Sequence, residues 1–165
     1  MQVPRKFNVG GGPKVNLMGG PKVNLILRIP LHFHKFTNQI ESMSPSRPRI
    51  SDTSFGAITV DHEAYTHDIL ITLKGKVKKR KKKLSKEIYG TSHTISLPEM
   101  EYIYEEKADG ILIGSGQYGL ATLSEEASAF LREKKCEVIV LPTPQAILKW
   151  EGLGGKWIGL FHITC

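Results

Sequence analysis

Long apolar runs and cysteines are both scarce in this 165-residue sequence. It contains no run of about 18 apolar residues, so it lacks the pattern of a transmembrane helix. The two cysteines, Cys136 and Cys165, are too few for a disulfide framework in a chain of this length. A reducing compartment is the default for such a chain, and we expect a cytoplasmic protein with no membrane association. Arg28 interrupts a short apolar stretch that lacks a small-residue cleavage site, so we expect no secretory signal.

Acidic residues are nearly missing from the first 42 positions, which hold six Lys or Arg and only Glu41. This segment carries a formal charge of +5, whereas residues 43–165 carry +2. The net charge of +7 therefore reflects the first segment more than the remainder. Because the remainder is close to neutral, net charge alone does not indicate a nucleic-acid surface.

The first 49 residues also differ in their local pattern. The heptapeptide GGPKVNL occurs at residues 11–17 and again at 19–25. Gly-Gly-Pro breaks helices and strands, and two copies are too few for a solenoid. We hypothesise that residues 1–42 do not belong to the functional protein and that Met43 is its natural start. The alternative is a basic docking tail. We therefore expect residues 1–49 to be a disordered or non-native extension, followed by a single α/β domain over residues 50–165.

Hydrophobic periodicity predicts regular structure only after Ile50. Strands are predicted at residues 55–60, 68–73, 77–80, 110–114, 137–141 and 157–165, and helices at 96–107, 124–135 and 143–150. A Ser-x-x-Glu capping box with Pro98 marks the start of the first helix. The apolar strands at 110–114 and 137–141 do not alternate and flank a helix, which predicts a parallel pair covered on both faces. The earlier strands form an antiparallel hairpin, so the fold class is α/β with a mixed sheet.

Four short strings occur in order along this part of the chain. They are YGTSH at residues 89–93, GSGQYG at 114–119, LPT at 141–143 and FHITC at 161–165. The set resembles the small archaeal Mth domain family, whose relatives include the adipogenesis-associated Mth domain protein and a mitochondrial complex I assembly factor. The resemblance covers residues 50–165 and has no counterpart for residues 1–49. It implies a three-layer α/β fold with a central mixed sheet, and a role in assembly or regulation instead of a known catalytic activity.

The GSGQYG string matches the glycine pattern of a dinucleotide site, in which backbone N–H groups approach a pyrophosphate at a helix start. Here the next helix signal begins only at Ser124, and the following strand ends in Leu141-Pro142 without the acid that binds ribose. A tight structural turn is the favoured interpretation. Binding of a smaller anion by the same turn is the alternative.

A basic run, KGKVKKRKKKLSK, covers residues 74–86. It lacks aromatic residues for base stacking, and charged side chains commonly protect a sheet edge, so a solvated edge is favoured. The alternative is a surface for nucleic acid or another anionic partner, whose affinity would fall steeply with salt. That surface would consist of Lys78, Lys79, Arg80, Lys81, Lys82 and Lys83.

His93, His162 and Cys165 suggest either a Cys–His nucleophile or a metal site. On a continuous strand, His162 and Cys165 would point to opposite faces, so packing or local hydrogen bonding is favoured for both. We therefore predict no catalytic residue, no cofactor and no metal ligand. Ser92 beside His93 does not make a catalytic triad, because no acid partner is indicated.

One candidate ligand pocket combines these polar strings. Its residues would be Thr91, Ser92, His93, Gly114, Ser115, Gly116, Gln117, Tyr118, Thr143, His162 and Cys165. The leading functional hypothesis is a non-enzymatic binding or assembly module with a protein partner or self-association, which an exposed apolar patch would support. The alternative is a small-molecule or anion-binding protein, or an enzyme, that uses this pocket and would need a cleft joining its residues.

Overall fold

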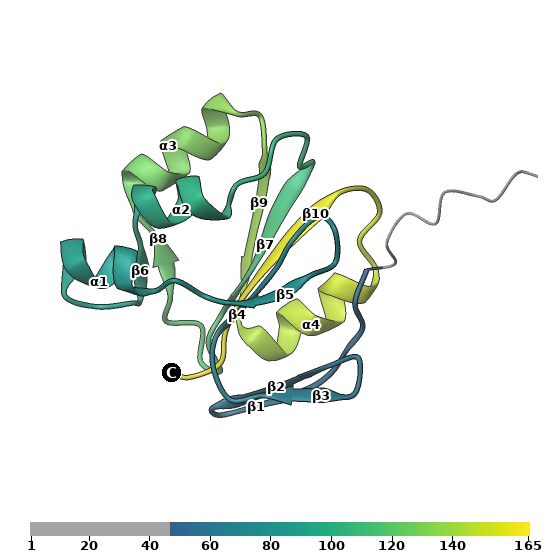
Figure 1. Ribbon diagram of the computed structural model, residues 1–165. Helices are drawn as coiled ribbons and strands as arrows, with labels where there is room; N and C mark the ends of the chain where they lie inside the picture. The colour runs from purple at the N-terminus through teal and green to yellow at the C-terminus, as the bar shows by residue number, and fades with distance from the viewer. Residues whose placement is uncertain (1–46) are drawn as a thin grey trace, which may run out of the picture. The chain divides into compact units, whose positions relative to one another are not determined.

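The computed structural model describes residues 47–165, which form a five-stranded mixed sheet with layers on both faces (Figure 1). The strand order is β5 (Val77–Lys79), β4 (Ile69–Ile71), β10 (Trp157–His162), β7 (Gly110–Ser115) and β9 (Glu137–Leu141). Strand β10 pairs in parallel with β7, and β7 pairs in parallel with β9. Strand β4 pairs antiparallel with β10 and with β5. The predicted mixed α/β sheet and its parallel pair are confirmed.

Two further sheets and four helices complete the domain. A three-stranded antiparallel sheet consists of β1 (Ile50–Ser54), β2 (Ala57–Val60) and β3 (Glu63–Tyr65). A two-stranded sheet pairs β6 (Thr94–Ile95) with β8 (Thr122–Leu123). The helices are α1 (Lys83–Tyr89), α2 (Leu97–Ile103), α3 (Glu125–Glu133) and α4 (Thr143–Glu151). None of these helices is long and apolar enough to cross a membrane.

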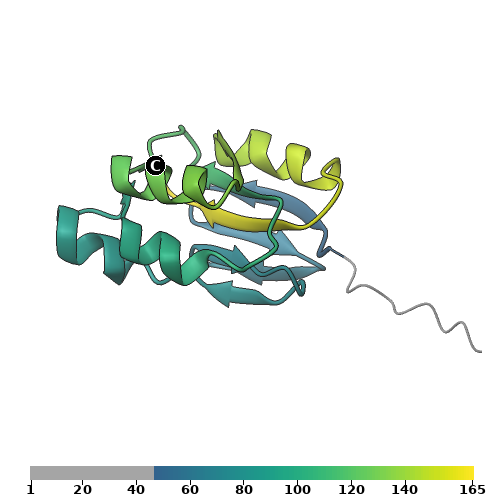
Figure 2. The ribbon, with the colours of Figure 1, turned by 90° about the horizontal axis from the view of Figure 1, so that it is seen from above.

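The main sheet separates two apolar cores, which gives the three layers. On one face, Trp150 of α4 packs with Ile58 of β2 and Phe161 of β10. On the other face, α2 and α3 pack against the alternate residues of β7 and β10, such as Ile113 and Leu160. Figure 1 shows α1 to α3 on one side of the main sheet, and α4 with the three-stranded sheet of β1 to β3 on the other. The view from above shows yellow β10 running beside α4 (Figure 2).

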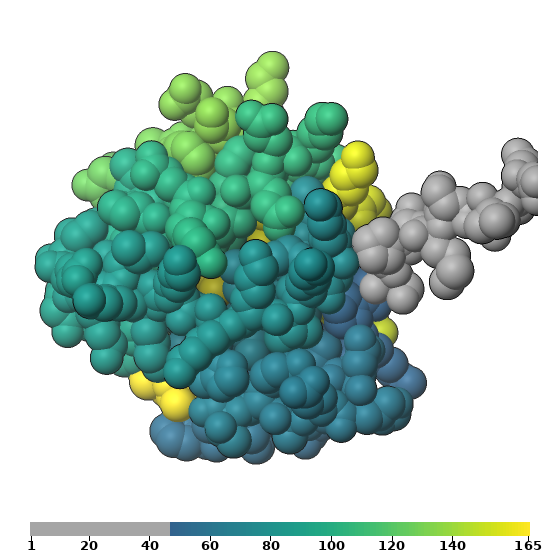
Figure 3. Space-filling view, viewed as in Figure 1, coloured from purple at the N-terminus to yellow at the C-terminus, as the bar shows by residue number. Residues whose placement is uncertain are grey.

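The central position of β10 explains its composition. All six of its residues are buried, as are all six of β7. In the space-filling view, yellow atoms of the C-terminal segment stand out at the upper right and lower left, and only small yellow areas are visible among the teal elements between them (Figure 3). Parallel strands covered on both faces need continuous apolar sequence, which is the pattern that predicted β7. The expectation that its parallel partner is covered in the same way is wrong, because β9 is an edge strand of the sheet and none of its residues is fully buried.

Several predicted boundaries differ from the structure. Helix α2 ends at Ile103 instead of Lys107, because Tyr104 is extended and Lys107 has a φ of 71°. Strand β10 ends at His162 instead of Cys165, and the last three residues leave the sheet. Helix α1 was not predicted, because its basic sequence hides its period and its only fully buried residue is Ser85.

Contacts with the domain begin before Ile50. The Arg47 guanidinium lies 4.9 Å from the centroid of the Trp150 ring, and Trp150 Nε1 donates to the Pro48 carbonyl at 2.8 Å. The predictions for residues 1–42, including the start at Met43, lie outside the described residues.

Candidate functional site

The titratable groups of greatest interest lie where the parallel strands end. His162 at the end of β10 is in register with Ser115 at the end of β7, and Gly114 is in register with Leu141 at the end of β9. In open α/β sheets, ligand sites form at the carboxyl ends of parallel strands. All four strings of the sequence resemblance end at or near this edge. Segments that are far apart along the chain therefore meet at one place in the fold.

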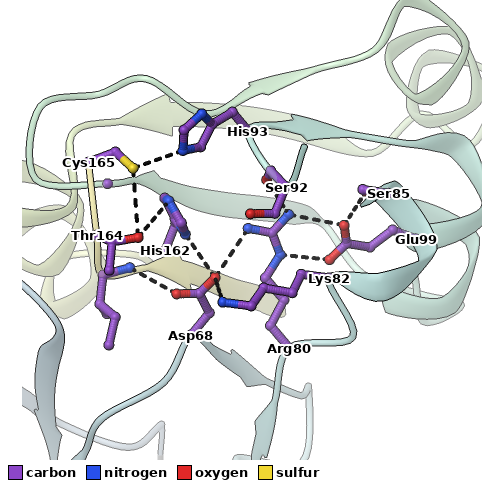
Figure 4. Close-up of polar contacts among 12 residues, drawn as sticks. Asp68, Arg80, Lys82, Ser85, Ser92, His93, Glu99, His162, Thr164 and Cys165 are labelled. Atoms are coloured by element: carbon purple, nitrogen blue, oxygen red, sulfur yellow. Dashed lines mark hydrogen bonds and ion pairs between the residues drawn. The ribbon is translucent and has the colours of Figure 1, made fainter. Parts of the chain in front are cut away.

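Three side chains at this edge form a compact group, which we call the His–Cys cluster: His93, His162 and Cys165 (Figure 4). Each offers one donor atom, and these atoms lie within 4.8 Å of one another. His93 Nε2 lies 2.8 Å from Cys165 Sγ. The His93 and His162 rings pack edge to face, with their centroids 5.5 Å apart. The expectation that His162 and Cys165 point apart is wrong, because β10 ends at His162 and strand alternation no longer applies to Cys165.

Asp68 lies behind the His–Cys cluster and orients one of its rings. Its Oδ2 atom lies 2.8 Å from His162 Nδ1, and its Oδ1 accepts a hydrogen bond from the Ile163 amide at 3.2 Å. Burial alone would raise the pKa of Asp68, but the hydrogen bond from His162, the charges of His162 and Arg80 and the Ile163 amide together lower it. An ionised carboxylate only accepts hydrogen bonds, so His162 donates from Nδ1 and directs Nε2 towards Thr164 Oγ1 at 3.1 Å.

A second group, the arginine cluster, joins the first through Asp68 and consists of Arg80, Glu99, Asp68 and Ser85 (Figure 4). Arg80 donates from Nε and Nη2 to the two oxygens of Glu99 at 2.7 and 3.0 Å, and Nη1 lies 3.5 Å from Asp68 Oδ2. Ser85 donates a short hydrogen bond to Glu99. The assignment of Arg80 to an anion-binding surface is therefore wrong, because it is only 4% exposed and paired with two acids.

The remaining members of the basic run behave differently from Arg80. Lys78, Lys79, Lys81 and Lys83 are exposed, and Lys82 is half-buried with its Nζ 3.8 Å from Asp68 Oδ2. Strand β5, at the edge of the main sheet, carries two of these lysines. This placement agrees with charge protecting an open edge. Contact of the lysines with nucleic acid stays a prediction.

The sequence missed Asp68, Arg80 and Glu99 as a functional group because each had a local explanation. Glu99 occupies the last position of the predicted capping box, but only half of that box forms. The Ser96 side chain accepts from the Glu99 amide at 3.3 Å, whereas the Ser96 amide donates to Ser85 Oγ at 2.8 Å. The Glu99 carboxylate is thus free to pair with Arg80. In the sequence, the position of Asp68 directly before an apolar strand was the one feature that could have indicated this group.

The glycine-rich turn at residues 114–119 encloses the chain's own last residues. The amides of Gln117 and Tyr118 donate to the carbonyl oxygens of Thr164 and Cys165 at 3.3 and 2.8 Å. The amide of Gly116 donates to Thr143 Oγ1 at 3.0 Å. A Cβ on Gly116 would lie 2.3 Å from the Thr164 oxygen, so only glycine fits here. These amides are engaged, and strand β8 follows the turn instead of a helix, which argues against a dinucleotide site.

Most other candidate pocket residues also have structural partners. Ser115 Oγ donates to the Leu141 carbonyl, and Thr143 Oγ1 donates to the His162 carbonyl. The side-chain amide of Gln117 donates to Thr53 Oγ1 and to the Ser54 carbonyl. The Ser92 carbonyl accepts from Arg80, and Thr91 Oγ1 accepts from the His93 amide. The cavity of about 530 Å³ in the domain is lined by none of these residues. The structure therefore brings the strings together, but around the His–Cys cluster and not around that cavity.

Large apolar side chains are exposed on the loops that surround the C-terminal segment. Tyr118 is 75% exposed, Phe55 66% and Leu120 56%. Tyr118 and Leu120 belong to the loop whose amides bond to the last residues, and Phe55 lies between Ser54 and Gly56, which bond to Gln117 and Ile163. We call Phe55, Tyr118 and Leu120 the apolar rim.

Comparison with known proteins gives relatives but no function. A model for a family described as "Protein of unknown function (DUF498/DUF598)" matches residues 50–156. The crystal structure of the conserved hypothetical protein PH1505 from Pyrococcus horikoshii OT3 is 33% identical, with a TM-score of 0.67 over 71% of this chain and 99% of that one. A solved structure titled MT938 is 32% identical, with a TM-score of 0.61 over 72% and 99% of the two chains.

More distant structures share the fold alone. A protein from Bordetella parapertussis is 16% identical, with a TM-score of 0.57 over 70% of this chain and 94% of that one. No curated protein matches the sequence. The family match spans well over half of the chain and agrees with the resemblance found in the sequence, so this chain belongs to the DUF498/DUF598 family of proteins of unknown function.

Proposed function

We propose that this protein is a non-enzymatic binding module that docks a protein partner on the apolar rim around its C-terminal segment. The observation that carries the proposal is the exposure of two aromatic residues, Phe55 and Tyr118, with Leu120 at one end of the sheet. Aromatic residues are enriched at the buried centres of protein interfaces, and each buries about 150–250 Å² when covered. The rim thus offers the type of surface that an assembly factor needs.

The backbone beneath the rim supports a docking role because hydrogen bonds hold its loops together. The loop of Phe55 is fixed by the Gly56 amide, which donates to the Ile163 carbonyl at 2.7 Å, and the loop of Tyr118 is fixed by the Cys165 carbonyl at 2.8 Å. The Gln117 side chain connects the two loops through the Ser54 carbonyl at 3.1 Å. A preorganised surface loses less entropy when it binds, which favours docking on these side chains.

The test is a double substitution of the two aromatic anchors, Phe55→Ser with Tyr118→Ser. The matched control is Ile88→Ser with Leu148→Ser, which removes two apolar side chains of comparable exposure elsewhere on the domain. Proteins retained by the immobilised full chain from cells of its source are quantified by mass spectrometry. We expect at least one partner to be retained by the parent and the control but reduced about 30-fold with the anchor variant, as for hot-spot residues worth about 2 kcal/mol.

Two results would contradict this function. One is a partner set that the anchor variant retains unchanged. The other is a parent chain that sediments as a monomer at all concentrations and retains no protein. The cytoplasm is part of the proposal, since both cysteines are free.

A further inference from the structure

We propose that the His–Cys cluster is a zinc(II) site in which His93 Nε2, His162 Nε2 and Cys165 Sγ are the protein ligands. This inference is independent of docking on the apolar rim. It rests first on the donor set, because two imidazole nitrogens and one thiolate are the ligands that zinc takes in proteins. Oxygen-preferring ions such as calcium and magnesium do not suit it.

The distances allow the three donors to surround one ion. Zinc lies about 2.0–2.1 Å from nitrogen and 2.3 Å from sulfur, so tetrahedral ligands are separated by roughly 3.3–3.6 Å. The donors here lie within 4.8 Å of one another, and one pair, His93 Nε2 and Cys165 Sγ, is 2.8 Å apart. Binding requires shifts of about 1 Å at two half-buried side chains, His93 and Cys165. Metal bonds would replace two existing hydrogen bonds, His93 to Cys165 and His162 to Thr164.

The carboxylate behind His162 is the second and independent observation. Metal-binding histidines donate their other ring N–H to a carboxylate or carbonyl, which fixes the tautomer and raises the basicity of the ligand. His162 is 2% exposed and has this arrangement, with Nδ1 2.8 Å from Asp68 Oδ2. Asp68 is itself held by the Ile163 amide and Arg80. The arginine cluster thus holds Asp68, and Asp68 in turn orients His162 for metal binding.

Three protein ligands leave the fourth position of a tetrahedral zinc ion open. Structural zinc sites use four protein ligands, whereas sites that bind a further molecule keep three. Since His93 and Cys165 are half-buried, solvent reaches the cluster from their side. The site therefore has the form of an accessible zinc centre, in which Cys165 binds as the thiolate and releases its proton to water.

Cobalt(II) is the probe for the test, since it takes the same geometry as zinc and reports thiolate ligation by absorption. The full chain, without an affinity tag, is stripped with a chelator and titrated with cobalt and then with zinc. We expect one cobalt per chain, a thiolate-to-cobalt charge-transfer band in the near ultraviolet, intense tetrahedral d–d bands, and displacement of all of these by one equivalent of zinc. Absence of the charge-transfer band would overturn the proposal.

Substitutions assign the ligands. Cys165→Ser and His93→Asn, both at half-buried positions, should each lower zinc affinity more than about 100-fold, and Asp68→Asn should lower it about 10–100-fold as a second-layer residue. Thr164→Val removes a hydrogen-bond competitor of the metal and should leave the affinity equal or higher. Circular dichroism shows whether each variant is folded, and Cys165→Ser alone keeps the test valid if Asp68→Asn does not fold.

Matched controls remove the same chemistry elsewhere. Cys136→Ala removes the other thiol, and His62→Asn removes an exposed histidine whose φ of 70° suits asparagine. His32→Gln with His34→Gln removes the two histidines of the N-terminal sequence. All three should bind cobalt as the parent does. Equal zinc affinity in Cys165→Ser and the parent, or loss of binding only in the His32 and His34 variant, would overturn the assignment.

Discussion

The two ends of the main sheet differ in what they hold and in how much space they leave. At the carboxyl ends of β7, β9 and β10, buried acids, histidines and an arginine are packed together with their partners. At the opposite end, a cavity of about 530 Å³ is lined by lysines and by Trp150 and Trp157. The cavity lining also includes Arg47 and Glu106, whereas the charged groups at the carboxyl ends are bonded to one another. We call the end with the cavity the hollow end and the end with the paired groups the filled end.

This contrast shows that a cavity and a cluster of titratable groups can form at different places in one fold. Parallel strands place their carboxyl ends together, so residues that follow several strands meet there whatever the space between them. At the amino ends, apolar side chains pack closely on the strands, as Trp157 does against Gly110, where a Cβ would lie 2.5 Å from the ring. Substitutions at the two ends should therefore have unequal effects.

The largest expected effect is that of Arg80→Met at the filled end. It leaves the Glu99 carboxylate, which is 0% exposed, without its charged partner. Removing one member of a buried ion pair costs about 3–5 kcal/mol, because the remaining charge stays desolvated. Urea unfolding followed by circular dichroism measures the loss. Lys79→Met, on the exposed edge strand β5, is the control and should change the free energy of unfolding by less than about 0.5 kcal/mol. Equal effects would show that the arginine cluster does not hold this end together.

A smaller difference is expected between glycines with positive φ at the two ends. Gly116→Ala places a Cβ against the backbone oxygens of Thr164 and Cys165, which cannot move without releasing the C-terminal segment. We expect a loss of about 3 kcal/mol. Gly155→Ala, at the cavity end, meets the flexible side chain of Asp109 and should cost about 1–2 kcal/mol.

Gly56→Ala isolates the contribution of backbone strain, since its φ is 80° and nothing lies within 4 Å of the added atom. It should cost no more than Gly155→Ala, whose added atom also meets Asp109. If Gly116→Ala costs no more than Gly56→Ala, the turn does not depend on close contact with the last residues.

The two cysteines offer a chemical form of the same comparison, because Cys136 precedes β9 at one end and Cys165 lies at the other. Burial, with the charges of Asp109 and Glu137, raises the pKa of Cys136 to about 11. At pH 8 this leaves about 100-fold less thiolate than in a free thiol. Iodoacetamide on the native protein should therefore label Cys165 and spare Cys136, as measured by peptide mass spectrometry. Zinc should then protect Cys165, and preferential labelling of Cys136 would contradict the structure.

The sign of the Cys136 pKa shift also gives a pH dependence. The folded state keeps the thiol protonated, so its contribution to stability is complete below about pH 9 and is lost as pH rises towards 11. Cys136→Ala should flatten the decline in the free energy of unfolding across that range. A decline that is identical in parent and variant would argue against a buried thiol.

The main sheet and helices α2 to α4 were more predictable from the sequence than the site was, whereas the short strands β1, β3, β6 and β8 were not predicted. Continuous apolar sequence identified β7 and β9, and cap residues such as Ser96 and Ser124 marked helix starts, since both signals are local. Helix α1 was hidden because lysines fill its sequence and little of it is buried. The motifs around Gly116, His93 and His162 were recognised, and the structure brings them to one edge.

What the sequence did not contain was the pairing of distant groups. Asp68 and His162 lie 94 positions apart, and Arg80 and Glu99 lie 19 apart. No periodicity encodes such a contact, and an acid at a strand start or in a helix cap already has a sufficient local reason. The alternation rule failed at Cys165 for a related reason, because the glycine turn binds the last residues and ends the strand.

The smallest expected effect is at the hollow end, where Lys74→Gln with Lys156→Gln removes two exposed charges that line the cavity. Neither change leaves a buried group unpaired, so the free energy of unfolding should shift by less than about 0.5 kcal/mol. The affinity of zinc for the His–Cys cluster should not change, because the lysines line the opposite end of the sheet. A marked loss of stability would mean that the cavity walls support the fold as the arginine cluster does. A change in zinc affinity would mean that the two ends are coupled through β10, the strand that connects them.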